Sequence, residues 1–188
     1  MSAPPDLPPV VQRAFDVSRR RGYVSFCRNE TGRLLAALAA TRSGTLAEFG
    51  TGTGVGTAWL RSGIREGSRI LTAELEPRLA EAAASIFDDD DRVEVAAADW
   101  STLRDRGPFS LLFLDAREPK DSGADTIVDL VEPGGVVVLD DFTPCSSWPP
   151  VYEGRVDVLR EQWLTDERFT TVEVMVAADA SVLVAAKR

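Results

Sequence analysis

From Thr45 onward, short apolar runs alternate with stretches whose apolar residues have helical spacing. Buried parallel strands consist of continuous apolar residues, and the helices that connect them cover the faces of the sheet. The alternation therefore predicts an α/β fold built on a parallel sheet. The predicted strands are 46–49, 69–73, 92–97, 110–114 and 136–139. Helices are predicted to begin near Gly54, Pro77, Ser101 and Asp121.

The last part of the chain has a different pattern. A predicted helix at 154–164 is followed by predicted strands at 170–177 and 181–186, which only three residues separate. Parallel strands need a long crossover connection, which three residues cannot make. These strands should therefore form an antiparallel hairpin. With two further helices expected near the N-terminus, at 10–21 and 31–40, the architecture is a seven-stranded, mostly parallel sheet with helices on both faces.

The length of 188 residues suits one domain. We expect residues 1–9, which are rich in proline, to be flexible, and residues 10–188 to form the single domain. The N-terminus lacks the pattern of a secretory signal, and no apolar run reaches the ~20 residues that span a bilayer. We therefore expect a cytoplasmic protein that does not enter membranes.

Charge and residue types exclude several classes of function. The net charge of −9 argues against nucleic acid as a partner, because an acidic surface repels phosphates. The chain contains no histidine, which removes Ser-His-Asp and Cys-His catalysis and most zinc sites. Its two cysteines are too few for a disulfide framework and indicate a reducing compartment.

A glycine-rich turn, Glu48-Phe49-Gly50-Thr51-Gly52-Thr53-Gly54, lies between the first predicted strand and a helix. Glycines there allow a tight turn and let a ligand lie against the backbone. The turn could also be purely structural. A nicotinamide fingerprint needs a final small residue where Val55 or Thr57 stands, and a P-loop needs a lysine that is absent, so both fit badly.

Acidic residues also follow the second and third predicted strands. Glu74 ends the second strand, 24 residues after Gly50, where a carboxylate can accept both hydroxyls of a ribose. An acid in this position can instead have a structural role at the N-terminus of a helix, where the helix dipole favours it, and we assign that role to the neighbouring Glu76. Asp99 and Trp100 follow the third strand, where they could bind and stack on adenine, although Trp100 could equally be a core residue.

Three aspartates follow the fourth and fifth predicted strands: Asp115 after one, and Asp140 and Asp141 after the other. Ends of adjacent strands are about 4.8 Å apart, so these carboxylates should converge. A hard divalent cation such as Mg²⁺ would relieve their repulsion. The alternative is that one caps a helix while the others face solvent.

Taken together, these motifs resemble class I S-adenosylmethionine (SAM)-dependent methyltransferases, and most closely the cation-dependent O-methyltransferases of the catechol and caffeoyl-coenzyme A type. The resemblance covers about residues 31–188 and implies the Rossmann-like fold of that family. It implies Mg²⁺ or a similar cation on Asp115, Asp140 and Asp141, although the branch often has Asn where Asp141 stands. The residues that it implies for SAM binding are Glu48, Gly50, Thr51, Gly52, Gly54, Glu74, Leu75, Asp99, Trp100 and Asp115.

The sequence departs from this branch at the catalytic base. The branch has a lysine three residues after its first metal aspartate, but here that position is Glu118, with Lys120 two residues later. We therefore expect Asp115, Lys120 and Glu118 to be the catalytic residues, with metal activation of the acceptor as the main effect.

The expected reaction is methylation of a hydroxyl on a small molecule, with Trp148 and Tyr152 as candidate walls of the acceptor pocket. A homodimer is compatible with this expectation. Two rival functions stay open: a metal-independent methyltransferase of the same fold, and a protein that binds SAM without catalysis.

Overall fold

The protein is described by a computed structural model over residues 6–188. Of the stretch 1–9 that the sequence predicts to be flexible, residues 1–5 lie outside the described residues, and Pro9 already begins helix α1 (Pro9–Arg21). Among the described helices, none is both long and apolar enough to cross a membrane.

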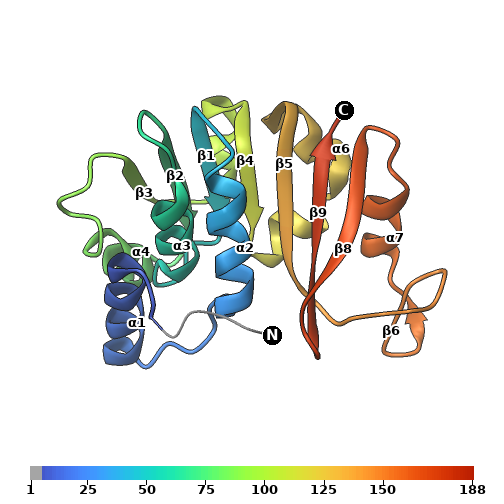
Figure 1. Ribbon diagram of the computed structural model, residues 1–188, viewed down its shortest axis with the longest axis horizontal. Helices are drawn as coiled ribbons and strands as arrows, with labels where there is room; N and C mark the ends of the chain where they lie inside the picture. The colour runs from blue at the N-terminus through green and yellow to red at the C-terminus, as the bar shows by residue number, and fades with distance from the viewer. Residues whose placement is uncertain (1–5) are drawn as a thin grey trace.

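Seven strands form one sheet in the order β3-β2-β1-β4-β5-β9-β8 (Figure 1). Strands β1 to β5 are parallel to their neighbours, whereas β9 is antiparallel to both β5 and β8. The predicted fold class, including the final hairpin, is thereby confirmed. The strands are β1 (Thr45–Phe49), β2 (Arg69–Glu74), β3 (Val93–Ala97), β4 (Phe109–Leu114), β5 (Val131–Phe142), β8 (Phe169–Ala177) and β9 (Ala180–Lys187).

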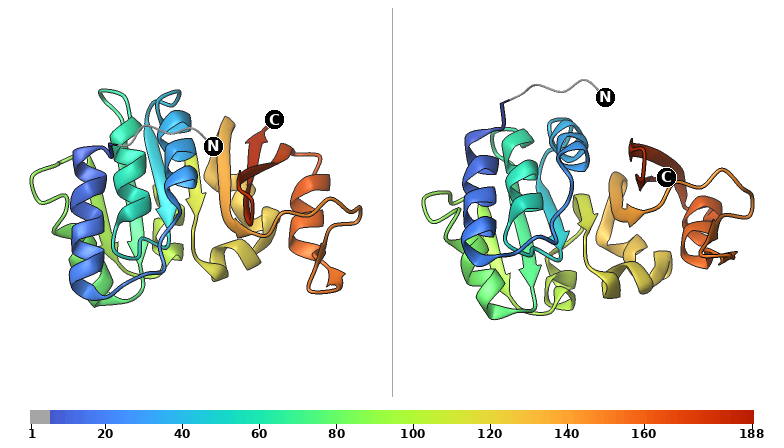
Figure 2. Two further views of the ribbon diagram at one scale, coloured as in Figure 1. Left: turned by 60° about the horizontal axis from the view of Figure 1, so that its bottom comes forward. Right: turned by 90° about the horizontal axis from the view of Figure 1, so that it is seen from below.

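Helices cover both faces of this sheet and enclose two hydrophobic cores (Figure 2). One core lies beneath α1, α2 (Asn29–Ala39), α3 (Val55–Gly63) and α4 (Pro77–Ala84). The other lies beneath the 3₁₀ helices η1 (Trp100–Arg106) and η2 (Val128–Leu130), with α6 (Gly123–Ile127) and α7 (Val158–Thr165). Successive residues of a strand face opposite cores: Leu46 of β1 packs in the first and Ala47 in the second.

Three predicted helices differ from the structure. The one expected near Ser101 is the 3₁₀ helix η1, capped by Asp99. The one expected near Asp121 is two short helices, α5 (Arg117–Asp121) and α6, and Gly123, the first residue of α6, has a positive φ of 76°. The helix predicted at 154–164 begins only at Val158, because the residues before it form the small hairpin of β6 (Val151–Tyr152) and β7 (Arg155–Val156).

Two glycines allow α2 and α3 to approach each other closely. A Cβ atom on Gly32 would lie 2.2 Å from the indole ring of Trp59, and one on Gly63 would lie 2.1 Å from the carbonyl oxygen of Ala36. A side chain at either position would force the helices apart.

We expect Gly32→Ala to lower the free energy of unfolding by about 2 kcal/mol. Overpacking against Trp59 should outweigh the about 1 kcal/mol by which alanine favours a helix. Urea denaturation measures this difference, with Ala37→Ser on the exposed side of α2 as the control. A Gly32→Ala protein as stable as the parent would show that the two helices adjust without cost.

One carboxyl group lies inside the first core. Glu48 of β1 is fully buried, and its Oε2 accepts hydrogen bonds from the hydroxyls of Thr57 and Thr72, whereas its Oε1 has no partner. Burial raises the pKa of Glu48 to about 8, although the bonds from both threonines oppose the shift. The folded protein therefore holds this group as a neutral acid at neutral pH.

This burial predicts a pH-dependent stability. The pKa of Glu48 in the folded protein lies above the ordinary value of 4.5, so its contribution is fully present below pH 4.5 and is lost as the pH rises toward about 8. The loss should be about 1.4 kcal/mol for each pH unit in this window. Urea denaturation from pH 5 to 8.5 should show a smaller decline in Glu48→Gln than in the parent; equal declines would contradict the assignment.

Candidate functional site

Apart from Glu48, the predicted site residues lie at one edge of the sheet, where the parallel strands end. Three cavities open there in the described part of the chain, and each is named here after a feature that lines it. The glycine-loop cavity borders the Trp100 cavity, and both are lined by Gly50, Glu74 and Ala116. The Lys120 cavity shares Asp141 with the glycine-loop cavity. Ligands of open α/β sheets bind at this edge.

The glycine turn after β1 needs glycine for two reasons. Gly50, Gly52 and Gly54 all have positive φ, at 103°, 54° and 89°. In addition, a Cβ atom on Gly50 would come within 2.8 Å of Ala116. The turn therefore lies directly against the chain that follows β4, and its backbone forms the floor of the cavity.

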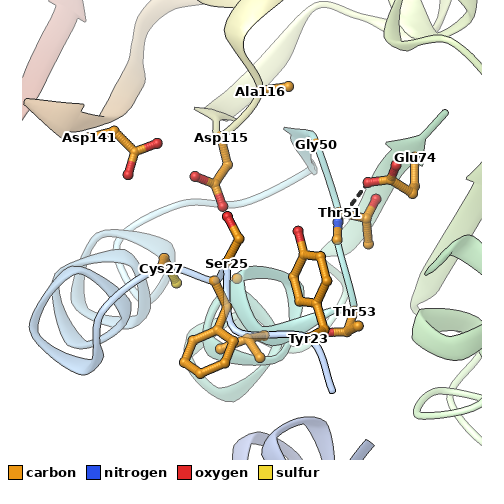
Figure 3. Close-up of a pocket in the computed structure, with 14 residues that line it drawn as sticks. Tyr23, Ser25, Cys27, Gly50, Thr51, Thr53, Glu74, Asp115, Ala116 and Asp141 are labelled. Atoms are coloured by element: carbon orange, nitrogen blue, oxygen red, sulfur yellow. Dashed lines mark hydrogen bonds between the residues drawn. The ribbon is translucent and has the colours of Figure 1, made fainter. Parts of the chain in front are cut away.

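Glu74 is held in place by the backbone of two different segments. Its Oε2 accepts a hydrogen bond from the Gly52 amide at 2.8 Å, and its Oε1 accepts one from the Glu76 amide at 2.9 Å. Each carboxylate oxygen keeps a further lone pair, so both can also accept hydroxyl groups from a ligand. Figure 3 shows the first of these bonds, beside the cavity. Leu75, which follows, is exposed and lines the Trp100 cavity.

Asp99 and Trp100 line the cavity next to Glu74, as the sequence predicts for a ligand site. The Trp100 ring also packs on Phe49, with ring centroids 5.2 Å apart, so it serves both the core and the cavity. Asp99 caps η1 by accepting the Ser101 amide at 2.9 Å, and bonds from Ser101 lower the pKa of this carboxyl. Its ionised form is therefore stabilised before any ligand binds.

The three aspartates converge as predicted. Carboxylate oxygens of Asp115, Asp140 and Asp141 all lie within 4.8 Å of one another. Burial, followed by the charge of Asp140, raises the pKa of Asp115 well above its usual value, and burial raises the pKa of Asp140 to about 6. The acids thus repel one another in the absence of a neutralising charge.

Lys120 supplies one positive charge to this acid cluster. Its Nζ donates to Oδ2 of Asp141 at 3.0 Å and to the carbonyl oxygen of Asp140 at 3.2 Å. Its side chain is only 11% exposed, so this ion pair is largely shielded from water on the lysine side. Asp141 has an unusual positive φ of 69°, which re-aims the chain directly after Asp140.

The structure separates Glu118 from the acid cluster. Glu118 is exposed and lines the Trp100 cavity with Glu74, whereas Lys120 reaches Asp140 and Asp141. Of the two residues that the sequence offered as a base, the structure therefore brings only Lys120 to the aspartates. Glu48 lines none of the three cavities, because it lies fully buried behind the glycine turn.

Sequence reasoning missed the linker between α1 and α2, which supplies one wall of the glycine-loop cavity. Tyr23, Ser25, Phe26 and Cys27 all line it. The Tyr23 hydroxyl would lie 3.0 Å from a Cβ atom on Gly52, so its ring occupies the space that a side chain there would fill (Figure 3). Burial raises the pKa of this phenol. A short polar and aromatic segment without periodicity was the only signal available.

The Lys120 cavity meets the acid cluster at Asp140 and Asp141. Asp140, Asp141, Lys120, Tyr152 and Leu159 are among the residues that line it. Of the two aromatics that the sequence offered as walls of an acceptor pocket, Tyr152 therefore lines this cavity. Trp148 is 64% exposed and does not line it.

Similar proteins give this site a context. One curated relative, a catechol O-methyltransferase from Mycobacterium tuberculosis, is 33% identical over 123 aligned residues, and the match covers 60% of this chain. The chain spans about half the length of that relative, 54%.

Solved structures share the fold over nearly the whole chain. An O-methyltransferase from Bacillus cereus in complex with SAH superposes with a TM-score of 0.78 at 21% identity, covering 97% of this chain and 93% of that one. The O-methyltransferase TomG from Streptomyces achromogenes, in complex with SAM, gives 0.76 at 22% identity, covering 97% and 92%.

A family model described as a methyltransferase domain matches residues 47–142. The match covers the glycine turn, Glu74, Asp99 and all three aspartates, which are the residues that the structure gathers at the edge of the sheet. The chain belongs to this family of methyltransferase domains.

Proposed function

We propose that the protein is a SAM-dependent methyltransferase that methylates a hydroxyl group of a small molecule. The observation that carries the proposal is Glu74, fixed by the glycine turn where two cavities meet. The titratable groups of the glycine-loop cavity fit a cationic ligand: Glu74, Asp115 and Asp141 line it, and no Lys or Arg is among its described lining residues.

Each part of the cofactor has candidate partners in this chain. Trp100 and Asp99 would hold the adenine, and the Glu74 carboxylate would accept the ribose hydroxyls. The glycine-loop cavity would hold the methionine part, with its sulfonium facing the acids. When bound, SAM supplies an electrophilic methyl group.

The acceptor would bind in the Lys120 cavity, which meets the glycine-loop cavity at Asp141. Lys120 would hold the acceptor oxygen by its positive charge, and Tyr152 would cover the acceptor. Much of the rate of a methyl transfer comes from aligning the acceptor oxygen with the methyl group. Similarity to a catechol O-methyltransferase supports an oxygen acceptor.

The acid cluster fits a divalent cation such as Mg²⁺. Three carboxylates within 4.8 Å are a hard oxygen donor set. Burial, together with the charges of neighbouring aspartates, raises the pKa of Asp115 and Asp140, so a cation there would stabilise their ionised forms. When bound, such a cation would lower the pKa of the acceptor hydroxyl.

One observation favours a second candidate function, a methyltransferase that uses no metal. Lys120 already forms an ion pair with Asp141 and accounts for part of the charge that a cation would otherwise balance. In that case Lys120 alone would stabilise the acceptor oxyanion.

The cofactor proposal predicts that Glu74→Gln weakens binding of S-adenosylhomocysteine by about 1.5–3 kcal/mol, the scale of a charge-assisted hydrogen bond. Isothermal calorimetry measures the loss, and the parent should show negligible binding of NAD or ATP. Glu66→Gln, on an exposed turn, should bind like the parent. Unchanged affinity in Glu74→Gln would remove Glu74 from the site.

The acceptor and metal proposals are tested by methyl transfer to a panel of catechols. Activity should require Mg²⁺, a chelator should abolish it reversibly, and Asp115→Asn should lose far more activity than Glu118→Gln. We expect Glu118→Gln to lose less than tenfold in kcat, under about 1.4 kcal/mol, because it lies away from the aspartates. Full activity in excess chelator would favour the metal-free alternative, and cofactor binding without turnover of any acceptor would favour a non-catalytic protein.

A further inference from the structure

Glu48 is a titratable group at the site that the proposed reaction does not use. It lies on the face of β1 that packs against α3, with no exposed surface. Oε2 is held by Thr57 and Thr72, but Oε1 is buried without a hydrogen-bond partner. A buried carboxyl group with an unpartnered oxygen is costly, so its presence calls for a function.

Only a glycine separates this carboxyl from the glycine-loop cavity. A Cβ atom on Gly56 would lie 2.1 Å from Oε1 of Glu48, so the carboxyl oxygen lies directly behind the Gly56 backbone. Gly56 itself lines the cavity. A charge in the cavity therefore acts on Glu48 across a short path through protein, where screening by water is weak.

Two hydroxyl groups also connect Glu48 to the cavity. The Thr72 hydroxyl donates to Oε2 at 3.0 Å, and it lies 2.5 Å from the Thr51 hydroxyl. Thr51 lines the cavity. This row of hydroxyls is a path by which a proton can pass between the buried acid and the site.

The groups that face Glu48 favour its neutral form while the cavity holds no cation. The negative charge of Glu74 on β2 raises the pKa of Glu48, and the charge of Glu48 in turn contributes to the raised pKa of Asp115 after β4. Cys27 in the α1–α2 linker is a buried thiol whose pKa is also raised, mainly by burial. Burial raises the pKa of Glu48 to about 8. A positive charge in the cavity would reverse this balance.

We propose that Glu48 is a specificity-determining residue that distinguishes the sulfonium cofactor from the neutral thioether product. The inference rests on the proposed SAM site. When the sulfonium cation binds, the Glu48 carboxylic acid releases its proton to solvent, and the resulting carboxylate attracts the cation. After methyl transfer the product carries no sulfonium charge, so Glu48 takes a proton back from solvent and the extra attraction is lost.

The consequence is a pH-dependent preference for cofactor over product. At a pH above both pKa values of Glu48, SAM binds more tightly than at a pH below both. The ratio of these two affinities is tenfold for each unit by which the bound cation lowers the pKa. We therefore expect the ratio of the two dissociation constants, SAH over SAM, to rise about tenfold from pH 6.5 to 8.5.

Calorimetry at pH 7.5 in two buffers of different ionisation enthalpy measures the protons released on binding. Chelator is present throughout, so that bound metal does not contribute. SAM should release more protons than SAH, and in Glu48→Gln both this difference and the rise of the ratio with pH should be reduced by the share that Glu48 contributes. Asp115, Asp140 and Tyr23 also titrate near the cavity, and the comparison with Glu48→Gln separates their contribution. Glu81→Gln, on the exposed side of α4, should behave like the parent.

The outcomes are distinguishable. The inference would be overturned if the difference in proton release and the rise of the ratio were as large in Glu48→Gln as in the parent, or if both ligands released equal numbers of protons in the parent. If neither ligand binds the parent, the proposed function itself fails. If Glu48→Gln does not fold, infrared difference spectra of the parent test the inference instead. The band of a protonated carboxyl group should be lost when SAM binds and retained when SAH binds. Retention of that band in both complexes would overturn the inference.

Discussion

The site depends on backbone hydrogen bonds at the ends of three adjacent strands. The amides of Gly50 and Thr51 donate to the carbonyl oxygen of Ala73 at the end of β2, and the amides of Asp115 and Ala116 donate to the carbonyl oxygen of Phe49. These bonds continue the parallel pairing of β1 with β2 and β4 by one step beyond the strands. They fix the glycine turn between Glu74 on one side and Asp115 on the other, so the cavity has its shape before a ligand arrives.

Negative charge is the second constraint on this site. Glu48, Glu74, Asp115, Asp140 and Asp141 all lie at or directly behind one edge of the sheet, where Lys120 forms an ion pair with Asp141. Burial raises the pKa of three of these acids, so the folded protein stores unfavourable electrostatic energy that a cationic ligand can relieve. A sulfonium and a divalent cation both have that effect, which links the proposed cofactor to the proposed metal.

The covering of the site comes from parts of the chain that are not in the parallel sheet. The α1–α2 linker places Tyr23 over Gly52, and β6 places Tyr152 in the wall of the cavity that Lys120 also lines. Arg28, at the end of the linker, forms a bidentate ion pair with Asp179 in the β8–β9 turn, at 2.9 Å for each bond. This pair joins the α1–α2 linker to the β8–β9 turn, although its exposure to water limits the stability that it adds.

The sequence by itself determined the sheet, the hairpin and the position of the glycine turn, because these follow from local periodicity and from connection lengths. It also determined that Asp115 meets Asp140 and Asp141, since strand ends that share an edge must converge. Tertiary structure alone decided between Glu118 and Lys120. Residues of a helix are about 100° apart around its axis, so two positions separated by two residues point in nearly opposite directions, and only packing fixes which one faces the acids. It also decided that Tyr23 covers the site and that Glu48 lies behind it, because the path of an aperiodic linker and the depth of a strand residue depend on the elements packed around them.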